Sequence, residues 1–257
     1  MSYFLSSLPL WITVLLLVVI PTALAMGAQV LIHRWVGVER LVQNNDIAGF
    51  KFATVGVIYA VLLGFTVIAV WEKFNAAENA VEQEAGSIAA LLRYAEGKDV
   101  EAVALRGALK NYASSAINNE WPAMADESES RATGQALNGV YDAALALGRT
   151  GTRETADMAE VFTQIDNVTA ARRVRIHLAT GLVPNVVWVA LFGGALLTVG
   201  FTLFFGSENL LAQVTMTGAL SVLVTLGLVV IVSVDHPFTG PVHVQPEPIV
   251  SVMAEIP

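Results

Sequence analysis

Four long stretches of the chain contain no Asp, Glu, Lys or Arg, and a charge-rich segment separates the second from the third. The uncharged stretches run Leu8–Ile32, Phe52–Trp71, Leu178–Phe205 and Leu210–Val234. Each reaches the roughly 20 apolar residues that a helix needs to cross a hydrocarbon core ~30 Å thick. Lipid cannot hydrogen-bond a backbone, so such runs are expected to be helical. The pattern predicts an all-α membrane protein with four transmembrane helices, and Pro21 predicts a kink in the first.

The charged segment between spans two and three has the apolar period of amphipathic helices, in steps of three and four residues. We expect four helices there. The first continues span two to Gly97, the second breaks at 118–122, the third follows the polar run 126–130, and the fourth continues from about Thr152 into span three. Short breaks between amphipathic helices are typical of an antiparallel bundle.

These elements divide the chain into four predicted parts. Residues 1–71 hold spans one and two, with a connecting polar loop from His33 to Lys51, and residues 72–177 form a water-facing helical bundle. Residues 178–234 form a transmembrane hairpin, and residues 235–257 form an extended tail. The tail is rich in Pro, which favours a polyproline-like conformation.

Composition excludes several classes of function. Charged residues are 14% of the chain against about 25% in soluble domains. The net charge of −8 and the absence of a basic patch argue against nucleic acid as a partner. With no cysteine, the chain has no thiol nucleophile or thiolate metal site. The four histidines (His33, His177, His236 and His243) show no metal-ligand spacing, so we expect no catalytic residue, no metal and no cofactor.

None of the four uncharged stretches carries an ionisable carboxylate, Lys or Arg, whereas pumps and ion-coupled carriers usually place such groups at membrane depth. This favours passive permeation of inorganic ions through a pore lined by hydroxyls and apolar constrictions. Thr54, Tyr59 and Thr66 on span two are the candidate lining hydroxyls. Four spans cannot enclose a wide pore, so such a channel must be a homo-oligomer in the bilayer.

Span two also carries a row of small residues in steps of three and four: Gly49, Ala53, Gly56, Ala60 and Gly64. Steps of this size keep the row on one face of a helix. In lipid, small residues let two helix backbones approach closely. The row therefore predicts a helix-packing surface.

Several polar residues at the span ends have two readings each. Asn44, Asn45 and Asp46 either cap the helix of span two or form a polar ring at a pore mouth. Lys51 is an interfacial anchor that would also attract anions in an assembled ring. Three arginines either anchor the chain at the interface or ring a vestibule: Arg172, Arg173 and Arg175. The pair Asp235 and His236 either caps span four or bonds to the bundle.

Five segments resemble the bacterial bestrophin-like membrane proteins. They are 44–52 (NNDIAGFKF), 56–63 (GVIYAVLL), 71–74 (WEKF), 120–122 (EWP) and 235–240 (DHPFTG), in the same order along nearly the whole chain. The family is grouped with bestrophins, which implies a pentameric anion channel whose second span lines the pore and whose helical body is cytoplasmic. The bestrophin neck residues have no match that we can assign in this sequence, so the anion pore is an analogy.

The sequence thus predicts a homo-oligomeric ion channel, anion-permeable by analogy. A cation channel of the same architecture is the first alternative, because Asp46 and the acidic bundle oppose the charge of Lys51. A membrane sensor or scaffold that signals through its bundle is the second. We expect a bacterial inner-membrane protein with both termini and the bundle on one side, and basic residues beside the spans favour the cytoplasm only narrowly.

Overall fold

The computed structural model describes residues 2–36, 38–43, 45–97, 99–150 and 154–254, and the secondary structure over these ranges is helical. Contacts divide the chain into two compact units. Unit 1 comprises Met1–Glu72 and Gly181–Asp235, and unit 2 comprises Lys73–Thr180 and His236–Pro257. The division falls within one long helix, α5, whose first part belongs to unit 1 and whose last part belongs to unit 2.

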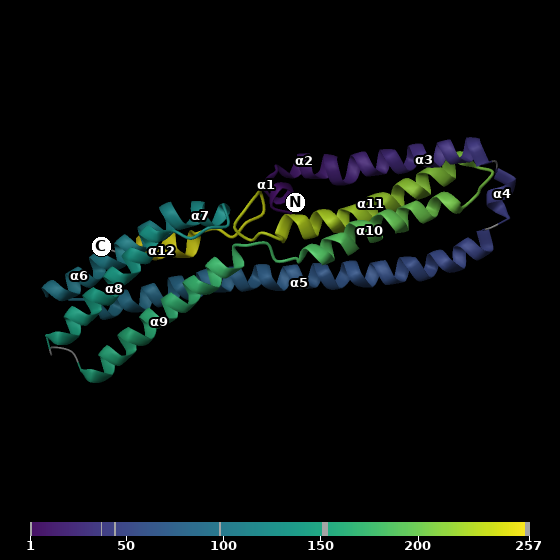
Figure 1. Cartoon of the computed structure of the whole chain (residues 1–257). Helices are drawn as coiled ribbons and strands as arrows, with labels where there is room; N and C mark the ends of the chain where they lie inside the picture. The colour runs from purple at the N-terminus through teal and green to yellow at the C-terminus, as the bar shows by residue number, and fades with distance from the viewer. Residues whose placement is uncertain (1, 37, 44, 98, 151–153, 255–257) are drawn as a thin grey trace. The chain divides into compact units, whose positions relative to one another are not determined.

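Unit 1 holds four candidate membrane spans. Three are the helical segments Leu10–Val36, Asn185–Phe204 and Leu210–Val234, and the fourth is the apolar part of the long helix Asn45–Tyr94. Its elements are α1 (Ser2–Ser7), α2 (Leu10–Val14), a π-helical turn (Leu15–Val19), α3 (Ile20–Val36), α4 (Val38–Val42), the start of α5 (Asn45–Tyr94), α10 (Asn185–Phe201), a 3₁₀ turn (Thr202–Phe204) and α11 (Leu210–Val234) (Figure 1). The four predicted spans are confirmed as helices that are long and apolar enough to cross a membrane.

Helix α11 is the central helix of unit 1. In its most apolar window 56% of residues are buried, against 11%, 17% and 22% in the other three spans. It contacts α3 and α10, and it is hydrogen-bonded to α3 through Thr22 and Ser221 (3.0 Å between hydroxyl oxygens). The other three spans leave many apolar side chains exposed, as a lipid-facing surface requires.

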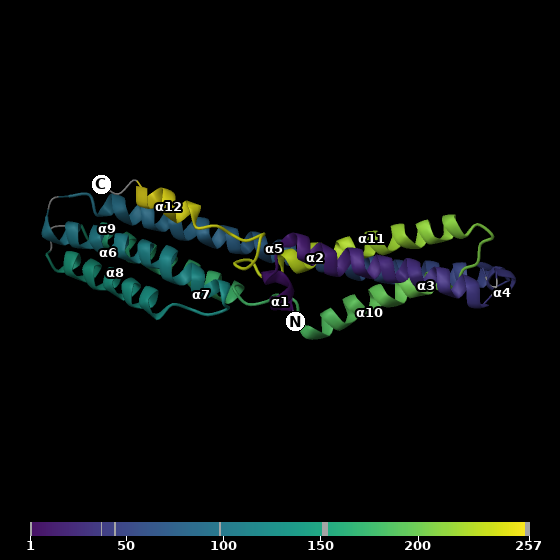
Figure 2. The same ribbon diagram turned by 90° about the horizontal axis from the view of Figure 1, so that it is seen from above.

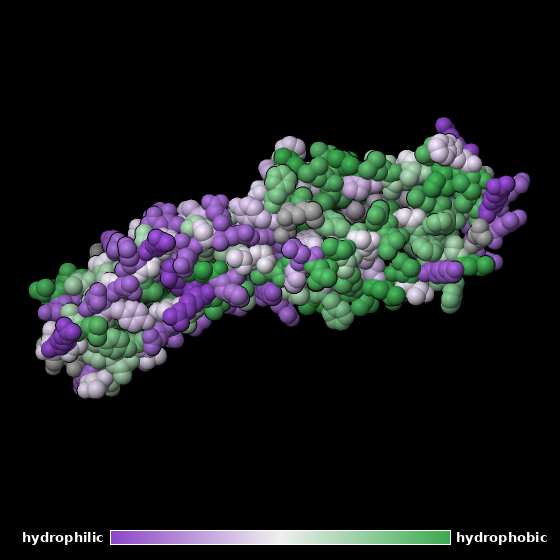
Figure 3. Space-filling model, in the orientation of Figure 1, coloured by the Kyte–Doolittle hydropathy of each residue, from purple (hydrophilic) through white to green (hydrophobic). Residues whose placement is uncertain are grey.

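Unit 2 is a bundle of antiparallel helices (Figure 2). It contains the end of α5, α6 (Val100–Ser115), a π-helical turn (Ala116–Glu120), α7 (Trp121–Ala125), α8 (Arg131–Arg149), α9 (Thr155–Leu178) and α12 (Glu247–Ala254). The predicted apolar faces form its core, which includes Ile88, Leu105, Leu109 and Ile165, all with no exposed surface. The surface of unit 2 is mostly hydrophilic, whereas that of unit 1 is mostly hydrophobic over its helices (Figure 3).

Both prolines expected to interrupt helices follow a π-helical turn. Pro21 comes two residues after the turn Leu15–Val19, and Pro122 comes two residues after the turn Ala116–Glu120. Proline has no backbone N–H and its ring crowds the preceding turn, and a wider π turn is one way for a helix to accommodate this. The predicted break at 118–122 is therefore wrong, because the chain stays helical from Val100 to Ala125.

Three further expectations need correction. The predicted polar loop after span one is largely helical, since α3 extends to Val36 and α4 follows. The fourth bundle helix does not continue into span three, because α9 ends at Leu178 and α10 begins only at Asn185, directly after Pro184. The tail is not wholly extended, because it forms α12 and buries Ile249 in unit 2.

Candidate functional site

Half of the membrane part of α5 is not covered by any other helix of unit 1. Its exposed residues recur in steps of three and four, which places them on one face. We call this surface the exposed α5 face and define it by Phe50, Ala53, Thr54, Val57, Ile58, Ala60, Val61, Gly64, Phe65, Ile68 and Ala69. It is apolar except for the hydroxyl of Thr54, which donates a hydrogen bond to the backbone carbonyl of Phe50 at 3.4 Å.

The other two candidate lining hydroxyls lie inside unit 1. Tyr59 is 4% exposed and packs against Gly194 of α10. Thr66 is buried and its hydroxyl donates to the backbone carbonyl of Leu62 at 2.8 Å. Of the three predicted lining residues, only Thr54 is on the exposed α5 face.

The predicted row of small residues runs along one edge of that face. A Cβ atom added to Gly56 or Gly64 would meet nothing within 4 Å, and one added to Gly49 would lie 3.9 Å from the ring of Phe205. Ala53 and Ala60 are exposed. Apart from the edge at Gly49, the row makes no close helix contact within the described part of the chain, so the predicted packing has no partner there.

The close contacts of α5 with glycines of its neighbouring spans occur instead at positions outside that row. A Cβ at Gly194 would lie 2.4 Å from the ring of Tyr59, and one at Gly227 would lie 2.6 Å from the side chain of Leu63. Both contacts join α5 to a neighbouring span. They show that the face of α5 opposite the exposed one packs against α10 and α11.

The polar residues at the start of α5 have different surroundings. The Asn45 side chain pairs with the backbone of Gly206: its Nδ2 donates to the Gly206 carbonyl and its Oδ1 accepts from the Gly206 N–H, each at 2.9 Å. Asn45 therefore fastens the α10–α11 connection to α5. Asp46 and Lys51 are exposed, and Asn44 lies outside the described residues.

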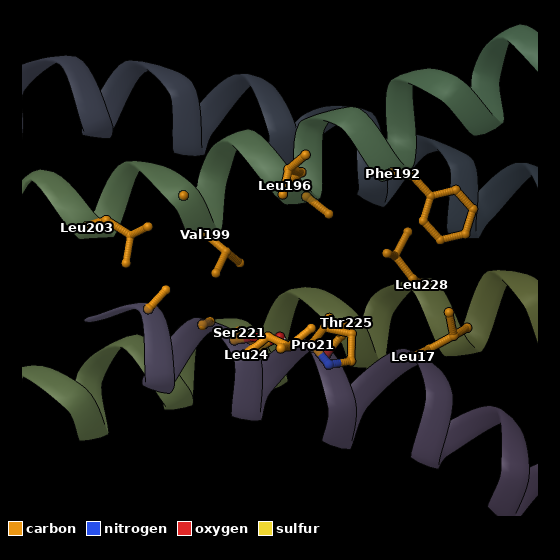
Figure 4. Close-up of a pocket in the computed structure, with 14 residues that line it drawn as sticks. Leu17, Pro21, Leu24, Phe192, Leu196, Val199, Leu203, Ser221, Thr225 and Leu228 are labelled. Atoms are coloured by element: carbon orange, nitrogen blue, oxygen red, sulfur yellow. Dashed lines mark hydrogen bonds between the residues drawn. The ribbon is translucent and has the colours of Figure 1, made fainter. Parts of the chain in front are cut away.

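Unit 1 also contains an apolar cavity of about 360 Å³ between α3, α10 and α11 (Figure 4). Leu24 and Pro21 approach it from α3, Leu196 and Val199 from α10, and Ser221 from α11. Apart from the hydroxyls of Ser221 and Thr225, its lining is apolar. It offers no ligand set for an ion. Among the residues that the structure describes, no three His, Asp or Glu side chains gather as a metal site.

The core of unit 2 contains a buried charge cluster, which we define as Glu84, Glu120, Arg172 and Arg175. The Arg175 Nε and Nη2 donate to the two carboxylate oxygens of Glu84 at 2.8 and 3.0 Å. Its Nη2 also donates to Glu120 Oε2 at 2.8 Å, and the Arg172 Nε donates to Glu120 at 3.0 Å. Two arginines thus face two carboxylates, which leaves the cluster neutral.

Aromatic side chains complete the surroundings of this cluster. The guanidinium carbon of Arg175 lies 4.5 Å from the ring centroid of Trp121, and the Tyr112 hydroxyl donates to Glu84 Oε1 at 2.6 Å. Burial alone would lower the pKa of Arg175, but the charge of Glu84 and the hydrogen bonds to it raise that pKa above its ordinary value. Burial, and then the charge of Glu84, raise the pKa of Tyr112 well above 10.0.

The three predicted interfacial arginines therefore have different roles. Arg175 has no exposed side-chain surface and belongs to the core of unit 2, so its prediction as an anchor or vestibule residue is wrong. Arg172 is 13% exposed and pairs with Glu120, whereas Arg173 is exposed. Glu84 and Glu120 were missed. Glu84 lies on the apolar face of its helix, three residues after Val81 and four before Ile88, which was a detectable sign of a buried pair.

Asp235 and His236 lie at the end of α11 and just after it. Asp235 Oδ1 accepts from the backbone N–H groups of Leu182 and Val183 at 3.0 and 2.8 Å. It therefore supplies the hydrogen bonds of these backbone groups in the non-helical segment that precedes α10. His236 Nε2 lies 3.0 Å from Glu127 Oε1 within unit 2. The alternative that one of this pair bonds to the bundle is therefore confirmed for His236.

A family model described as "Bestrophin-like domain" matches residues 19–249 of the chain. The chain belongs to the bestrophin-like family. The match spans both units and every segment on which the sequence resemblance rests.

Solved structures support the same fold. A variant of a bacterial bestrophin homologue from Klebsiella pneumoniae is 13% identical, with a TM-score of 0.76 over 93% of this bestrophin-like chain and 97% of that one. Another structure of that homologue gives 14% identity and a TM-score of 0.72, with 93% and 99% covered. A structure described only as a membrane protein is 14% identical to this chain and has a TM-score of 0.75. The match covers 93% of this chain and 96% of that one. No curated protein matches significantly.

Proposed function

We propose that this bestrophin-like protein is a homo-oligomeric ion channel in which the exposed α5 face surrounds the axis. An exposed apolar face is common to three of the spans and also fits lipid, so the grouping with bestrophins is what places α5 at the axis, and the one-sidedness of α5 agrees with it. Tyr59 and Thr66 lie against the protein's own spans, while Val57, Val61 and Phe65 are each at least half exposed. A ring of copies with α5 innermost places this apolar face around a pore, as the grouping with bestrophins implies.

The proposed pore is narrow and apolar. Val57, Val61 and Phe65 lie about one helical turn apart on α5, so each would form a ring of side chains. Hydrophobic constrictions of this kind gate by excluding water, and Thr54 would supply a ring of hydroxyls beside them. The edge of small residues, from Ala53 to Gly64, would let adjacent copies of α5 approach closely.

Selectivity is proposed to favour anions. Lys51 and Asp46 are both exposed at the start of α5 and carry opposite charges, so their balance sets the local potential at that end of the pore. The reversal potential in a chloride gradient measures the selectivity between anions and cations. Lys51→Gln should shift the reversal potential toward the cation value, and Asp46→Asn should shift it further toward the anion value. The opposite pair of shifts would favour the cation channel.

Ion flux from liposomes tests the conduction itself. The purified protein should dissipate an ion gradient, and Val61→Ser should raise the rate because a hydroxyl lowers the barrier to water in an apolar constriction. The matched control is Leu197→Ser, at an exposed apolar position on α10 that is outside the exposed α5 face. Absence of flux at varied pH, calcium and voltage, or equal effects of the two variants, would contradict the proposal.

We further propose that the protein resides in a bacterial inner membrane. An even number of spans puts both ends of the transmembrane region, and hence unit 2, on one side, and we assign that side to the cytoplasm. Lys73, Arg172 and Arg173 flank the spans on that side and Arg34, Arg40 and Lys51 flank them on the other, so the assignment rests on the grouping with bestrophins.

A further inference from the structure

A groove of about 530 Å³ lies between α8 and α9 in unit 2, whereas the proposed pore lies in unit 1. Three arginines line it: Arg131 at the start of α8, and Arg172 and Arg173 near the end of α9. The hydroxyls of Tyr141 and Thr169 also line it. Although the protein has 22 acidic and 14 basic residues, the charged residues that line this groove are all arginines.

Two of these arginines form no ion pair with the residues that the structure describes. Arg172 belongs to the buried charge cluster and pairs with Glu120. Neither Arg131 nor Arg173 forms an ion pair or a side-chain hydrogen bond with any part of the chain that the structure describes. The carboxylate beside the groove, Asp166, accepts a hydrogen bond from the Tyr141 hydroxyl at 2.9 Å.

The position of Arg131 adds to the positive potential. It is the first residue of α8, and the first turn of this 19-residue helix contains no acidic side chain. The N-terminal end of a helix carries a partial positive charge, so a cation there is unfavourable unless an anion compensates it. The Thr133 N–H of that turn already donates to the Ser130 hydroxyl at 3.3 Å, so the guanidinium of Arg131 is the group there that favours an anion.

We propose that this groove binds a small soluble dianion with phosphate or carboxylate oxygens, such as an organic phosphate. Arg131 and Arg173 supply two positive charges from two different helices, which matches the charge of a phosphate monoester near neutral pH. Planar guanidinium groups bind such oxygens through paired hydrogen bonds. The volume of the groove is in the range of small-molecule sites. Bound ligand would clamp α8 to α9.

Thermal unfolding of the full-length protein tests this assignment, with inorganic phosphate as the probe at constant ionic strength set by chloride. In phosphatidylcholine nanodiscs, phosphate should raise Tm saturably, by about 3 °C or more at roughly ten times the half-saturating concentration. The double variant Arg131→Gln/Arg173→Gln should lose this rise. The matched control is Arg93→Gln/Arg149→Gln, which removes two exposed arginines outside the groove.

The controls separate binding from other effects of phosphate. Phosphate stabilises proteins generally by exclusion from their surface, but that effect does not saturate at low concentration and should be equal in all variants. A wild-type rise that persists unchanged in the groove variant, or no saturable rise with phosphate or with succinate, overturns the proposal. A rise that requires phosphatidylglycerol in the nanodisc, and not dissolved phosphate, overturns the assignment to a soluble ligand. Titration calorimetry with phosphate provides the same comparison if a variant unfolds early.

Discussion

Single residues in the buried charge cluster hold three parts of the chain together. Glu84 comes from α5, Glu120 from the π-helical turn after α6, and Arg172 and Arg175 from α9. Desolvation of four charges offsets most of their mutual attraction, so the cluster is not by itself a source of stability. The cluster instead fixes how these elements are aligned along one another, because a shift of any one of them would leave a charge buried without its partner.

Removal of one member should therefore be severe. Arg175→Met keeps the volume but leaves Glu84 without its bidentate partner in a dry core, and we expect a loss of about 3–5 kcal/mol in the free energy of unfolding. The measurement is thermal or denaturant unfolding in detergent. Arg149→Met, at an exposed position on α8, should change stability by no more than about 0.5 kcal/mol. Equal stability of the two variants would show that the cluster does not fix the bundle.

Tyr112 should make the bundle sensitive to alkaline pH. Its pKa is raised above 10.0 in the folded protein, so its proton is held more tightly in the folded than in the unfolded state. The stability this gives is complete below pH 10.0 and is lost as pH rises above that value.

Tyr112→Phe should lower stability by about 1.5–3 kcal/mol at neutral pH, because it removes a hydrogen bond to a carboxylate. Its stability should then fall less steeply than that of the wild type above pH 10.0. Parallel pH profiles would contradict this account.

At the scale of helices, two adjacent glycines on α10 provide a matched test of packing. A Cβ at Gly194 would lie 2.4 Å from the Tyr59 ring, whereas one at Gly193 would meet nothing within 4 Å. Gly194→Ala should cost about 1–3 kcal/mol through overpacking, and Gly193→Ala should be neutral or stabilising because Ala favours a helix. The measurement is Tm in detergent for both variants. If Gly194→Ala is as stable as Gly193→Ala, α5 and α10 do not pack as closely as described.

The sequence predicted the elements better than their ends and contacts. Uninterrupted apolar runs are sufficient to place four spans, and the prediction that the first bundle helix continues span two is confirmed, although α5 ends at Tyr94 and not at Gly97. Local patterns could not show that Pro122 would be accommodated by a π turn, or that α9 would end before span three. The first depends on how a helix adjusts around a missing N–H, and the second on Asp235, which satisfies backbone groups at Leu182 and Val183.

The candidate site was predicted only in part for a related reason. Helical period placed Gly56 and Tyr59 on the same span, but only the neighbouring helices determine which side of α5 is covered. Arg175 looked like an interfacial residue because it lies close to a span in sequence. Its partners Glu84 and Glu120 are distant along the chain, and such pairing is not visible in local composition.

For the whole molecule, the edge of small residues on α5 distinguishes assembly from folding. Gly56 has nothing within 4 Å of an added Cβ in its own chain, so Gly56→Leu should leave the monomer folded. If the edge meets a second copy, the larger side chain should separate the helices and shift the oligomer peak in size-exclusion chromatography. Val55→Leu, one residue away, should be much milder. An unchanged peak for Gly56→Leu would place this edge against lipid.

The symmetry of the purified particle, determined by single-particle electron microscopy in a nanodisc, tests the central claim most directly. The account predicts a closed ring of four or more copies with the exposed α5 face around the axis. A monomer or dimer without an axial path would contradict the channel and favour a membrane sensor or scaffold.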